Sequence, residues 1–316
     1  MSLKNRIVKR TATILIVLIL LLIIAFIIEN VRRDSVSNYP PVGDFIDYDH
    51  SKIHYFKIGS GDRTVVFSSG NGTTSPYIDM YHMQEEISNR TETIVYERPG
   101  YGWSEPTSRE RSISTIVDEI EVVLDEASDN QSFIFVGHSM AALEIIHYAQ
   151  KYPEKVDGIV LIDGVHPQYA SQMENLVPVS IHITKLINST GVMRLLSHVD
   201  SVKQNLIQAR DLPENLNDLA LDFSLNQMWN QTMLAERREL NKNGQIVVNG
   251  NHLEDIPLII FSASENPMEG WKQSQETFTS WSNHAEQIWV DTNNHFIHLE
   301  QPELIIKEIH QLLDRE

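Results

Sequence analysis

Six short, continuous apolar runs are the feature that most constrains the fold of this 316-residue chain. Runs of this length without alternation are typical of strands buried on both faces. Segments with helical spacing of apolar residues separate most of them, as at 113–127, 141–152 and 303–313. This alternation predicts an α/β fold, with a mostly parallel, doubly wound sheet covered by helices on both faces. The runs are TVVFSS at 64–69, ETIVYE at 92–97, SFIFVG at 132–137, DGIVLID at 157–163, PLIIFSA at 257–263 and QIWVD at 287–291.

Two segments depart from this alternation. FIDYD at 45–49 and KIHYFKIG at 52–59 alternate apolar and polar residues, which predicts a β-hairpin with its turn at His50 and Ser51. From about 167 to 252 no strand pattern appears, while SIHITKLI, VMRLLSHV and LNQMWNQTML have the spacing of amphipathic helices. We therefore expect a helical cap at about 167–252, inserted into a folded domain that spans 43–316. Its apolar side chains either line a pocket or only dock the cap; they are Met173, Leu176, Ile187, Met193, Leu196, Met228, Trp229 and Met233.

The N-terminal segment carries an uncharged run at residues 12–28, ATILIVLILLLIIAFII. As a helix this run spans about 25 Å, and Thr11 with a snorkelling Arg10 lets it cross a bilayer. A cleaved secretory signal is the alternative, but the run is longer than a usual signal core and ENVRRDSVSNYPP after it offers no small-x-small cleavage site. We expect one transmembrane signal anchor at 11–28 and a linker at 29–42.

The basic residues around this run predict its orientation. Residues 1–10 contain four of them, Lys4, Arg6, Lys9 and Arg10, whereas Arg32 and Arg33 follow the run beside acidic residues. By the positive-inside rule, residues 1–10 are cytoplasmic and the folded domain lies on the outer side of the cell membrane.

Charge and cysteine content exclude several functions. Beyond residue 10 the chain has 21 basic against 43 acidic residues, a formal charge of −22, so nucleic acid is not an expected partner of the folded part. The absence of cysteine excludes disulfides, a thiol nucleophile and a thiolate metal site. No metal-binding or nucleotide-binding spacing occurs, so the sequence implies neither a metal nor a cofactor.

The motif GHSMA at 137–141 lies between an apolar run and a helical pattern. This is the context of a nucleophile elbow, a tight strained turn that lifts a serine hydroxyl off the sheet and leaves little room for neighbouring side chains. Ala141 stands where glycine is commoner and adds only one methyl group. The motif makes Ser139 the candidate nucleophile.

From about residue 43 to its end, the chain resembles the α/β-hydrolase superfamily. The resemblance rests on the elbow, on SGNG at 69–72 after a strand, on RPGYGWS at 98–104 and on NHFIHLEQPE at 294–303. It implies an oxyanion hole built from the backbone N–H groups of Asn71 and Met140. The family often has His-Gly at the positions of Ser69 and Gly70, and a glycine-rich turn without a catalytic role is the alternative. We interpret residues 98–104 as a loop at the rim of the pocket.

The candidate general base is His295, which lies after the last strand and before the C-terminal helix. From there an imidazole reaches over the strand ends to Ser139, and a near-neutral pKa suits it to move the serine proton. We interpret His298 as a packing or helix-capping residue and His138 as structural.

The acid of the triad has two candidates. The usual site in similar enzymes follows the strand PLIIF, where this chain has Ser264, Glu265 and Asn266, and asparagine cannot carry the charge. Asp163 ends the preceding strand, where some members of the superfamily have their acid. We favour Asp163 and keep Glu265 as the alternative.

These residues predict a serine hydrolase that cleaves a small-molecule carboxylic ester or related acyl compound through an acyl-enzyme. Serine at the elbow excludes the aspartate nucleophile of similar epoxide hydrolases. An amidase or peptidase, a lactonase and a C–C hydrolase use the same apparatus and stay open. A membrane-anchored binding module that kept the fold without turnover is the non-enzymatic alternative.

Overall fold

The computed structural model describes residues 3–33, 39–207 and 211–315. Its centre is one eight-stranded sheet with the strand order β1-β2-β4-β3-β5-β6-β7-β8. The strands are β1 (Asp44–Tyr48), β2 (Ser51–Ile58), β3 (Thr64–Ser68), β4 (Glu92–Glu97), β5 (Phe133–His138), β6 (Val156–Ile162), β7 (Leu258–Ala263) and β8 (Ala285–Val290). Strands β3 to β8 are parallel, and they correspond to the six apolar runs of the sequence. The predicted α/β fold with a mostly parallel sheet is confirmed.

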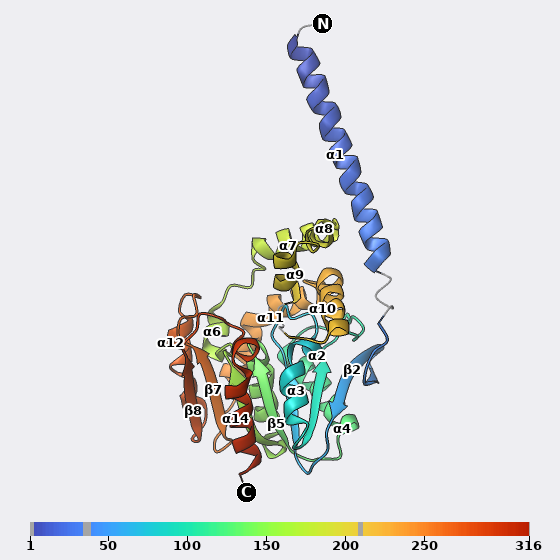
Figure 1. The fold of residues 1–316 in the computed structure, drawn as a ribbon. Helices are drawn as coiled ribbons and strands as arrows, with labels where there is room; N and C mark the ends of the chain where they lie inside the picture. Colours follow the sequence, from blue (N-terminus) through green and yellow to red (C-terminus); the bar gives the residue numbers. More distant parts are fainter. Residues whose placement is uncertain (1–2, 34–38, 208–210, 316) are drawn as a thin grey trace.

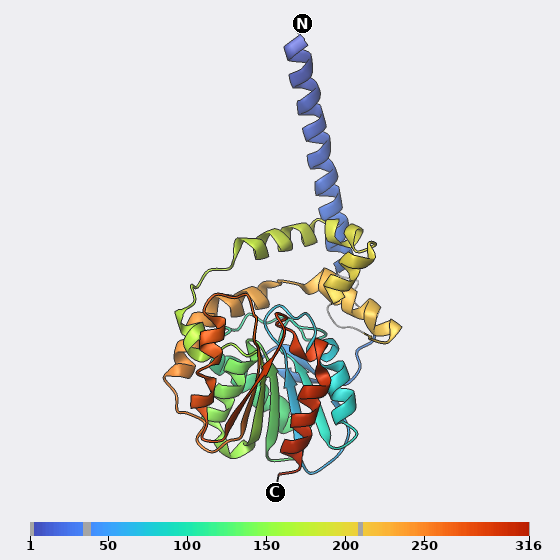
Figure 2. The ribbon, with the colours of Figure 1, turned by 60° about the vertical axis from the view of Figure 1, so that its left-hand side comes forward.

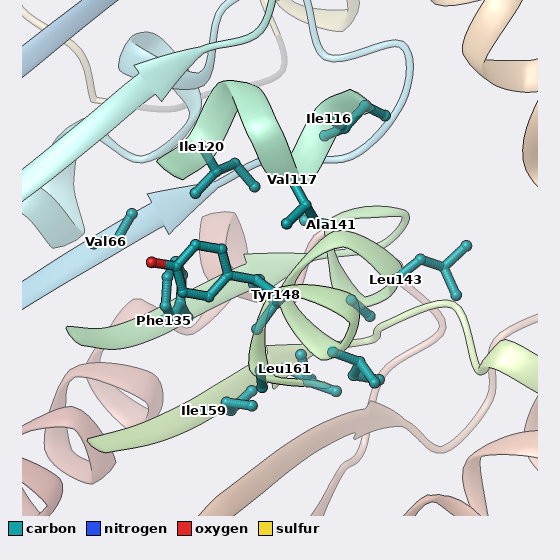
Figure 3. Close-up of a cluster of buried hydrophobic side chains, with 14 of the residues drawn as sticks. Val66, Ile116, Val117, Ile120, Phe135, Ala141, Leu143, Tyr148, Ile159 and Leu161 are labelled. Carbon is teal, nitrogen blue, oxygen red and sulfur yellow. The ribbon is translucent and has the colours of Figure 1, made fainter. Parts of the chain in front are cut away.

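The strands lack alternation because helices cover both faces of the sheet. In β5, Phe135 packs on one face with Val66, Ile159 and Leu161, beneath helices α4 (Ile113–Ala127) and α5 (Ala141–Lys151), as Figure 3 shows. Its neighbour Val136 faces the opposite way, into a second core. That core includes apolar residues of α3 (Tyr81–Ile87) and α14 (Pro302–Leu313). Successive side chains of one strand therefore pack into hydrophobic cores on opposite faces of the sheet, so residues that point to either face are apolar.

The hairpin forms one residue earlier than predicted. Strands β1 and β2 pair antiparallel, with Tyr48 opposite Ser51, so Asp49 and His50 form the two-residue turn. Both have positive φ, 47° and 66°, as a tight turn that follows the twist of its strands requires. The predicted turn at His50 and Ser51 is wrong because Asp49 adopts the left-handed conformation that aspartate tolerates.

Between β6 and β7, the described residues form helices and contain no strand. The helices are α6 (Pro167–Gln172), α7 (Val179–Ser189), α8 (Val192–Leu196), α9 (Asp200–Ile207), α10 (Glu214–Gln227) and α11 (Gln231–Val248). They lie over the carboxyl ends of the strands (Figures 1 and 2). The prediction of one helix through LNQMWNQTML is wrong. Trp229 has a φ of 57°, and Asn230 caps a new helix by accepting the N–H of Met233 on its side chain.

Helix α1 (Leu3–Arg33) rises away from the domain at the cap side, while the C-terminus lies at the opposite end (Figure 1). Its segment Asn5–Arg32 is long and apolar enough to cross a membrane, and no side chain of the apolar run at 12–28 is buried against the domain. The helix continues five residues past the predicted end of the span, through the start of the predicted linker. Residues 34–38 of that linker and residues 1–2 lie outside the described residues.

Candidate active site

Ser139 follows β5 at a strained turn. Its φ is 56°, a conformation rare for residues with a side chain, and its N–H donates to the carbonyl of Ile162 at 3.1 Å. The neighbours leave no room around it: a Cβ added at Gly137 would lie 2.2 Å from Ile145 and 3.1 Å from the Cβ of Ala141. The methyl group of Ala141 therefore fits because position 137 is glycine. The strain presents the hydroxyl at the start of α5, as the elbow motif requires.

His295 joins Ser139 to Asp163. Its Nε2 lies 2.8 Å from Ser139 Oγ, and its Nδ1 lies 2.7 Å from Asp163 Oδ2. The histidine stands in the loop between β8 and α13 (Ile297–Glu300), with 24% of its side chain exposed, whereas the side chain of Asp163 is fully buried. Because Nδ1–H donates to the carboxylate, the lone pair of Nε2 faces the serine hydroxyl. The three groups have the connectivity of a serine, histidine and acid triad.

The Asp163 carboxylate is held by three further donors. Oδ1 accepts the N–H of Ala263 at 3.1 Å and the indole N–H of Trp271 at 3.0 Å, and Oδ2 accepts the side-chain amide of Asn266 at 2.7 Å. The donors come from the end of β7, from the loop that follows it and from α12 (Trp271–Gln275). Asn266, which occupies the usual position of the acid, thus supports an acid supplied by the neighbouring strand.

Glu265 does not contact His295. It is exposed, and its contribution to the site is a backbone N–H that donates to the carbonyl of Thr292 at 3.0 Å. This bond joins the loop after β7 to the loop that carries His295. Of the two candidate acids, the structure therefore brings Asp163 and not Glu265 into the constellation.

The two candidate oxyanion donors flank Ser139. The chain at Gly70 passes so close that an added Cβ would lie 2.8 Å from the Cβ of Ser139, and Asn71 follows directly. Met140 precedes the first turn of α5. Within the described residues, neither backbone N–H donates to another backbone group, so both are free for a ligand oxygen. This arrangement is what an oxyanion hole needs.

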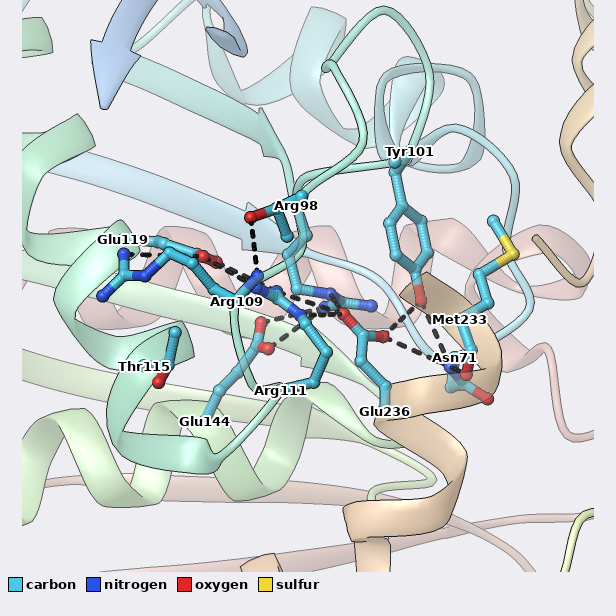
Figure 4. A network of polar contacts seen from close by, with 12 residues as sticks. Asn71, Arg98, Tyr101, Arg109, Arg111, Thr115, Glu119, Glu144, Met233 and Glu236 are labelled. Carbon is cyan, nitrogen blue, oxygen red and sulfur yellow. Dashed lines mark hydrogen bonds and ion pairs between the residues drawn. The ribbon is translucent and has the colours of Figure 1, made fainter. Parts of the chain in front are cut away.

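A buried charge network fixes the loop that carries Asn71 (Figure 4). Arg98 donates to the carbonyls of Ser69 at 2.9 Å and Gly70 at 3.3 Å, and it pairs with Glu144 at 3.1 Å and Glu236 at 3.3 Å. Burial alone would lower the pKa of Arg98, but the charges of Glu144 and Glu236 raise it well above its ordinary value. The guanidinium therefore stays charged and holds two successive carbonyls of the loop.

The cap takes part in the same network. Glu236 of α11 also pairs with Arg111 at 3.3 Å, and the side-chain amide of Asn71 donates to Glu236 at 3.2 Å and to the carbonyl of Met233 at 2.9 Å. The hydroxyl of Tyr101 donates to Glu236 as well. Helix α11 thus reaches both the candidate oxyanion loop and the loop at 98–104.

Our interpretation of residues 98–104 as a rim loop is wrong. Arg98 and Tyr101 are buried, and no residue of 98–104 lines the pocket beside Ser139. Their role is structural support from behind the oxyanion loop. One signal in the sequence pointed to this network: Glu144 interrupts the apolar pattern of the helix after the elbow, and a buried acid needs a buried cation.

The pocket beside Ser139 is small, with a volume of about 130 Å³. Trp229 and Phe296 supply its aromatic surfaces, and the glycine-rich loop supplies its backbone. Trp229 comes from the break between α10 and α11, so the cap reaches the site through the residue that interrupts the predicted helix. Of the eight cap side chains considered from the sequence, Trp229 lines this pocket, whereas Leu176 and Leu196 are exposed.

Three buried residues, Asp79, His138 and His298, lie next to the loop that carries His295. The Nε2–H of His138 donates to the carbonyl of His295 at 3.1 Å, and the Nε2 of His298 bonds Asp79 at 3.0 Å. Burial, together with His298 and His295, lowers the pKa of His138 well below its ordinary value, so its ring is neutral. Asp79, His138 and His298 place potential metal-ligand atoms within 4.8 Å of one another. Because His138 bonds the backbone of His295, this cluster supports the loop that carries His295.

Comparisons with known proteins agree with the fold. A sequence model described as alpha/beta hydrolase fold matches residues 63–302. The chain is 26% identical over 273 residues to Uncharacterized protein YbdG of Bacillus subtilis (strain 168), covering 84% of this chain and 83% of that protein. It is 23% identical over 182 residues to a pimeloyl-(acyl-carrier protein) methyl ester esterase of Shewanella woodyi, covering 52% of this chain and 67% of the esterase.

A solved structure with the same fold is the Bacillus megaterium epoxide hydrolase in complex with an inhibitor. It has a TM-score of 0.66 and 19% identity, covering 86% of this chain and 100% of the hydrolase chain. The similarity to this structure concerns the fold alone. The family match, at residues 63–302, includes both the elbow at 137–141 and the loop that carries His295. The chain belongs to the α/β-hydrolase fold family.

Proposed function

We propose that this protein is a membrane-anchored serine hydrolase that transfers the acyl group of a carboxylic ester to water. The observation that carries the proposal is the continuous chain of contacts from Ser139 through His295 to Asp163, at 2.8 Å and 2.7 Å. Each role needs that connectivity: a nucleophile, a base with its lone pair toward the nucleophile, and an acid on the other ring nitrogen.

In the acylation half, Ser139 Oγ attacks the carbonyl carbon while its proton passes to Nε2 of His295. The developing oxyanion accepts the N–H groups of Asn71 and Met140, and Asp163 stabilises the imidazolium. The imidazolium then gives its proton to the alkoxide, which leaves as the alcohol. In the second half, His295 takes a proton from water, the hydroxide attacks the acyl-enzyme, and the acid departs as the proton returns to Ser139.

The residue at the elbow supports an ester over an epoxide. Similar epoxide hydrolases use an aspartate nucleophile, and position 139 is serine. The relative from Shewanella woodyi is named an ester esterase, which agrees with acyl chemistry. The small aromatic pocket against Ser139 suits the acyl group or the alcohol of a compact ester.

The anchor is helix α1. Its span from Asn5 to Arg32 has the length and hydropathy of a transmembrane helix. The four basic residues before the apolar run favour a cytoplasmic N-terminus, with the catalytic domain on the outer side of the cell membrane.

A fluorophosphonate probe tests the reaction, because it modifies a serine that is activated beside an oxyanion hole. We expect the full chain to be labelled at Ser139 and to hydrolyse p-nitrophenyl esters, and Ser139→Ala to lose both properties. Ser114 is a matched control, since its Oγ lies 3.3 Å from Nε2 of His147 without an acid or an oxyanion loop, and Ser114→Ala keeps both. Labelling that persists in Ser139→Ala contradicts the proposal.

A further inference from the structure

The outer helices of the cap present apolar side chains to the surroundings. Among the described residues beyond α1, twelve large hydrophobic side chains are exposed, and eight of these lie between positions 176 and 199. Leu195 and Val179 are 71% and 73% exposed. We call this set the outer cap face: Leu176, Val179, Ile183, Leu186, Val192, Leu195, Leu196 and Val199.

The outer cap face follows helical periodicity. In α7 the exposed apolar residues are Val179, Ile183 and Leu186, at spacings of four and three, which is one side of a helix. The exposed polar residues of α7 are Ser180 and His182. The one buried residue of α7 is polar: Asn188 donates to the carbonyl of Ser224 of α10 at 3.3 Å, while Ile181 and Ile187 are partly buried. A helix at a water surface has the reverse arrangement, so α7 is built for an apolar environment on its outer side.

The charges of the segment favour a membrane over water. Residues 175–199 contain no acidic side chain, in a chain with 43 acidic residues. They do contain Lys185 and Arg194. A long stretch free of carboxylates, apolar on one side, is typical of a helix that lies in the interface of a bilayer.

The position of the face relative to α1 identifies the bilayer. Arg194 of the cap makes two hydrogen bonds to Glu29 of α1, at 2.8 Å and 3.0 Å. Glu29 is 2% exposed and packs against Gly191, and α1 also contacts α7. Glu29 follows directly on the apolar run that ends at Ile28. The cap is therefore fixed to α1 at the level where its apolar run ends, which is the boundary of the hydrocarbon core if α1 spans a bilayer.

We propose that the outer cap face inserts into the interface of the same bilayer that α1 spans. The inference rests on the proposed anchor and not on the proposed chemistry. Interfacial helices bury their apolar side about 5–10 Å into the boundary between headgroups and acyl chains, and side chains the size of leucine and valine suit this depth. Figures 1 and 2 show α7 and α8 beside the domain end of α1, on the side of the molecule from which α1 rises.

The absence of cysteine allows a direct test on the full chain in phosphatidylcholine nanodiscs. Single cysteines replace Leu195 in the outer cap face, Ile19 in α1 and the exposed Gln131 before β5, at the opposite end of the sheet. Each carries the polarity-sensitive fluorophore NBD, and doxyl-labelled phosphatidylcholine serves as the quencher. A far-UV circular dichroism spectrum that matches the unsubstituted chain shows that each variant is folded.

We expect the Leu195→Cys label to have blue-shifted emission and to be quenched by the doxyl lipid, as the Ile19→Cys label is, while the Gln131→Cys label stays unquenched. Solvent-like, unquenched emission at position 195 with quenching at position 19 overturns the insertion and leaves the anchor intact. Blue-shifted but unquenched emission at position 195 assigns the face to a second copy of the chain and also overturns it. An unquenched label at position 19 refutes the anchor and the insertion together.

Discussion

The carboxyl end of the sheet and the outer cap, helices α7 and α8, differ in which side chains they bury. Around the candidate site, Arg98, Glu144 and Glu236 are buried, and each is paired with a partner of opposite charge. In α7 and α8 most of the large apolar side chains are exposed, and the one buried residue is polar, Asn188. At the end of the sheet, buried charges are paired within the chain. In the outer cap, apolar side chains stay exposed and can contact a membrane or another molecule.

The difference shows which parts of the molecule are complete by themselves. A buried ion stays charged only if its partners are in place, so the sheet end is fixed by mutual dependence. Substituting an exposed leucine should change the free energy of unfolding little, because its side chain buries little apolar area within the domain. Changes at the sheet end should therefore have large effects on rate and stability, and changes in the outer cap should have small ones.

The largest effect should follow from neutralising Asp163. In Asp163→Asn an amide replaces the acceptor of the His295 Nδ1–H, so the ring loses its preferred tautomer and the imidazolium loses its counter-charge. We expect kcat on a p-nitrophenyl ester to fall by about 10⁴-fold, as for other triads, and Glu265→Gln to change it by less than about tenfold. The reverse ranking, with both variants folded, would assign the acid to Glu265.

The contact of 2.7 Å between Asn266 and Asp163 permits a sharper form of this test. The double variant Asp163→Asn, Asn266→Asp exchanges the two side chains. It places the carboxylate after β7, where similar enzymes have it, and the pair still consists of one amide and one acid. We expect it to recover about tenfold or more of the activity lost in Asp163→Asn, since the charge stays beside His295. Asn266→Asp alone should not raise activity, because it sets two carboxylates against each other.

An intermediate effect should come from Glu236, which links the cap to the oxyanion loop. Glu236→Gln leaves Arg98 and Arg111 without a shared carboxylate in a buried place, and breaking such pairs costs about 3–5 kcal/mol. The matched change is Asp218→Asn in α10, whose partly exposed partner Lys203 of α9 lies 3.3 Å away, and it should cost less than about 0.5 kcal/mol. Urea unfolding of the full chain in detergent measures both, and equal losses would break the contrast between the two regions.

A smaller effect than that of Glu236→Gln concerns His166, where β6 leads into the cap. Burial lowers the pKa of His166 to about 4, so between pH 6.5 and 4 the unfolded chain takes up a proton that the folded chain does not. The stabilisation is complete above pH 6.5 and is lost as the pH falls, amounting to a loss of about 2 kcal/mol at pH 5.

His166→Asn provides the control, because the Nδ1 of His166 accepts the N–H of Gln168 at the start of α6. Asparagine accepts the same bond and does not titrate, but it gives up the Nε2 atom that accepts the indole N–H of Trp281 at 3.2 Å. The variant should therefore be less stable at pH 7.5 and lose less of its stability toward pH 5. Parallel pH profiles of the two proteins would show that His166 does not contribute.

The sequence predicted the sheet because burial on both faces leaves a direct signal. The run at 92–97 matches β4 and the helical pattern at 113–127 matches α4, residue for residue. The cap was harder to predict, since its helices are short and one pattern, LNQMWNQTML, continues across the break at Trp229. A single residue with positive φ redirects the chain there, and apolar periodicity carries no information on it.

The candidate site was predictable in part. Motif and chain order pointed to Ser139 and His295, and the end of β6 pointed to Asp163, whose role stays a proposal. Neither the support from Asn266 nor the pairing of Arg98 with two carbonyls could be predicted, because both depend on which loops the sheet brings together. Arg98 and Glu236 are 138 positions apart in the chain, and only the docking of α11 makes them partners.

The pairing of Arg194 with Glu29 has a consequence for how the protein meets its substrate. A domain on a flexible linker samples many orientations relative to its anchor. Here two hydrogen bonds from Arg194 to the Glu29 carboxylate, with Gly191 packed against it, hold the domain in one orientation relative to α1. If α1 spans a bilayer, Ser139 then works at a constant height above it. The encounter rate of such an enzyme depends on molecules per unit area of membrane, so it responds to how strongly an ester partitions into lipid.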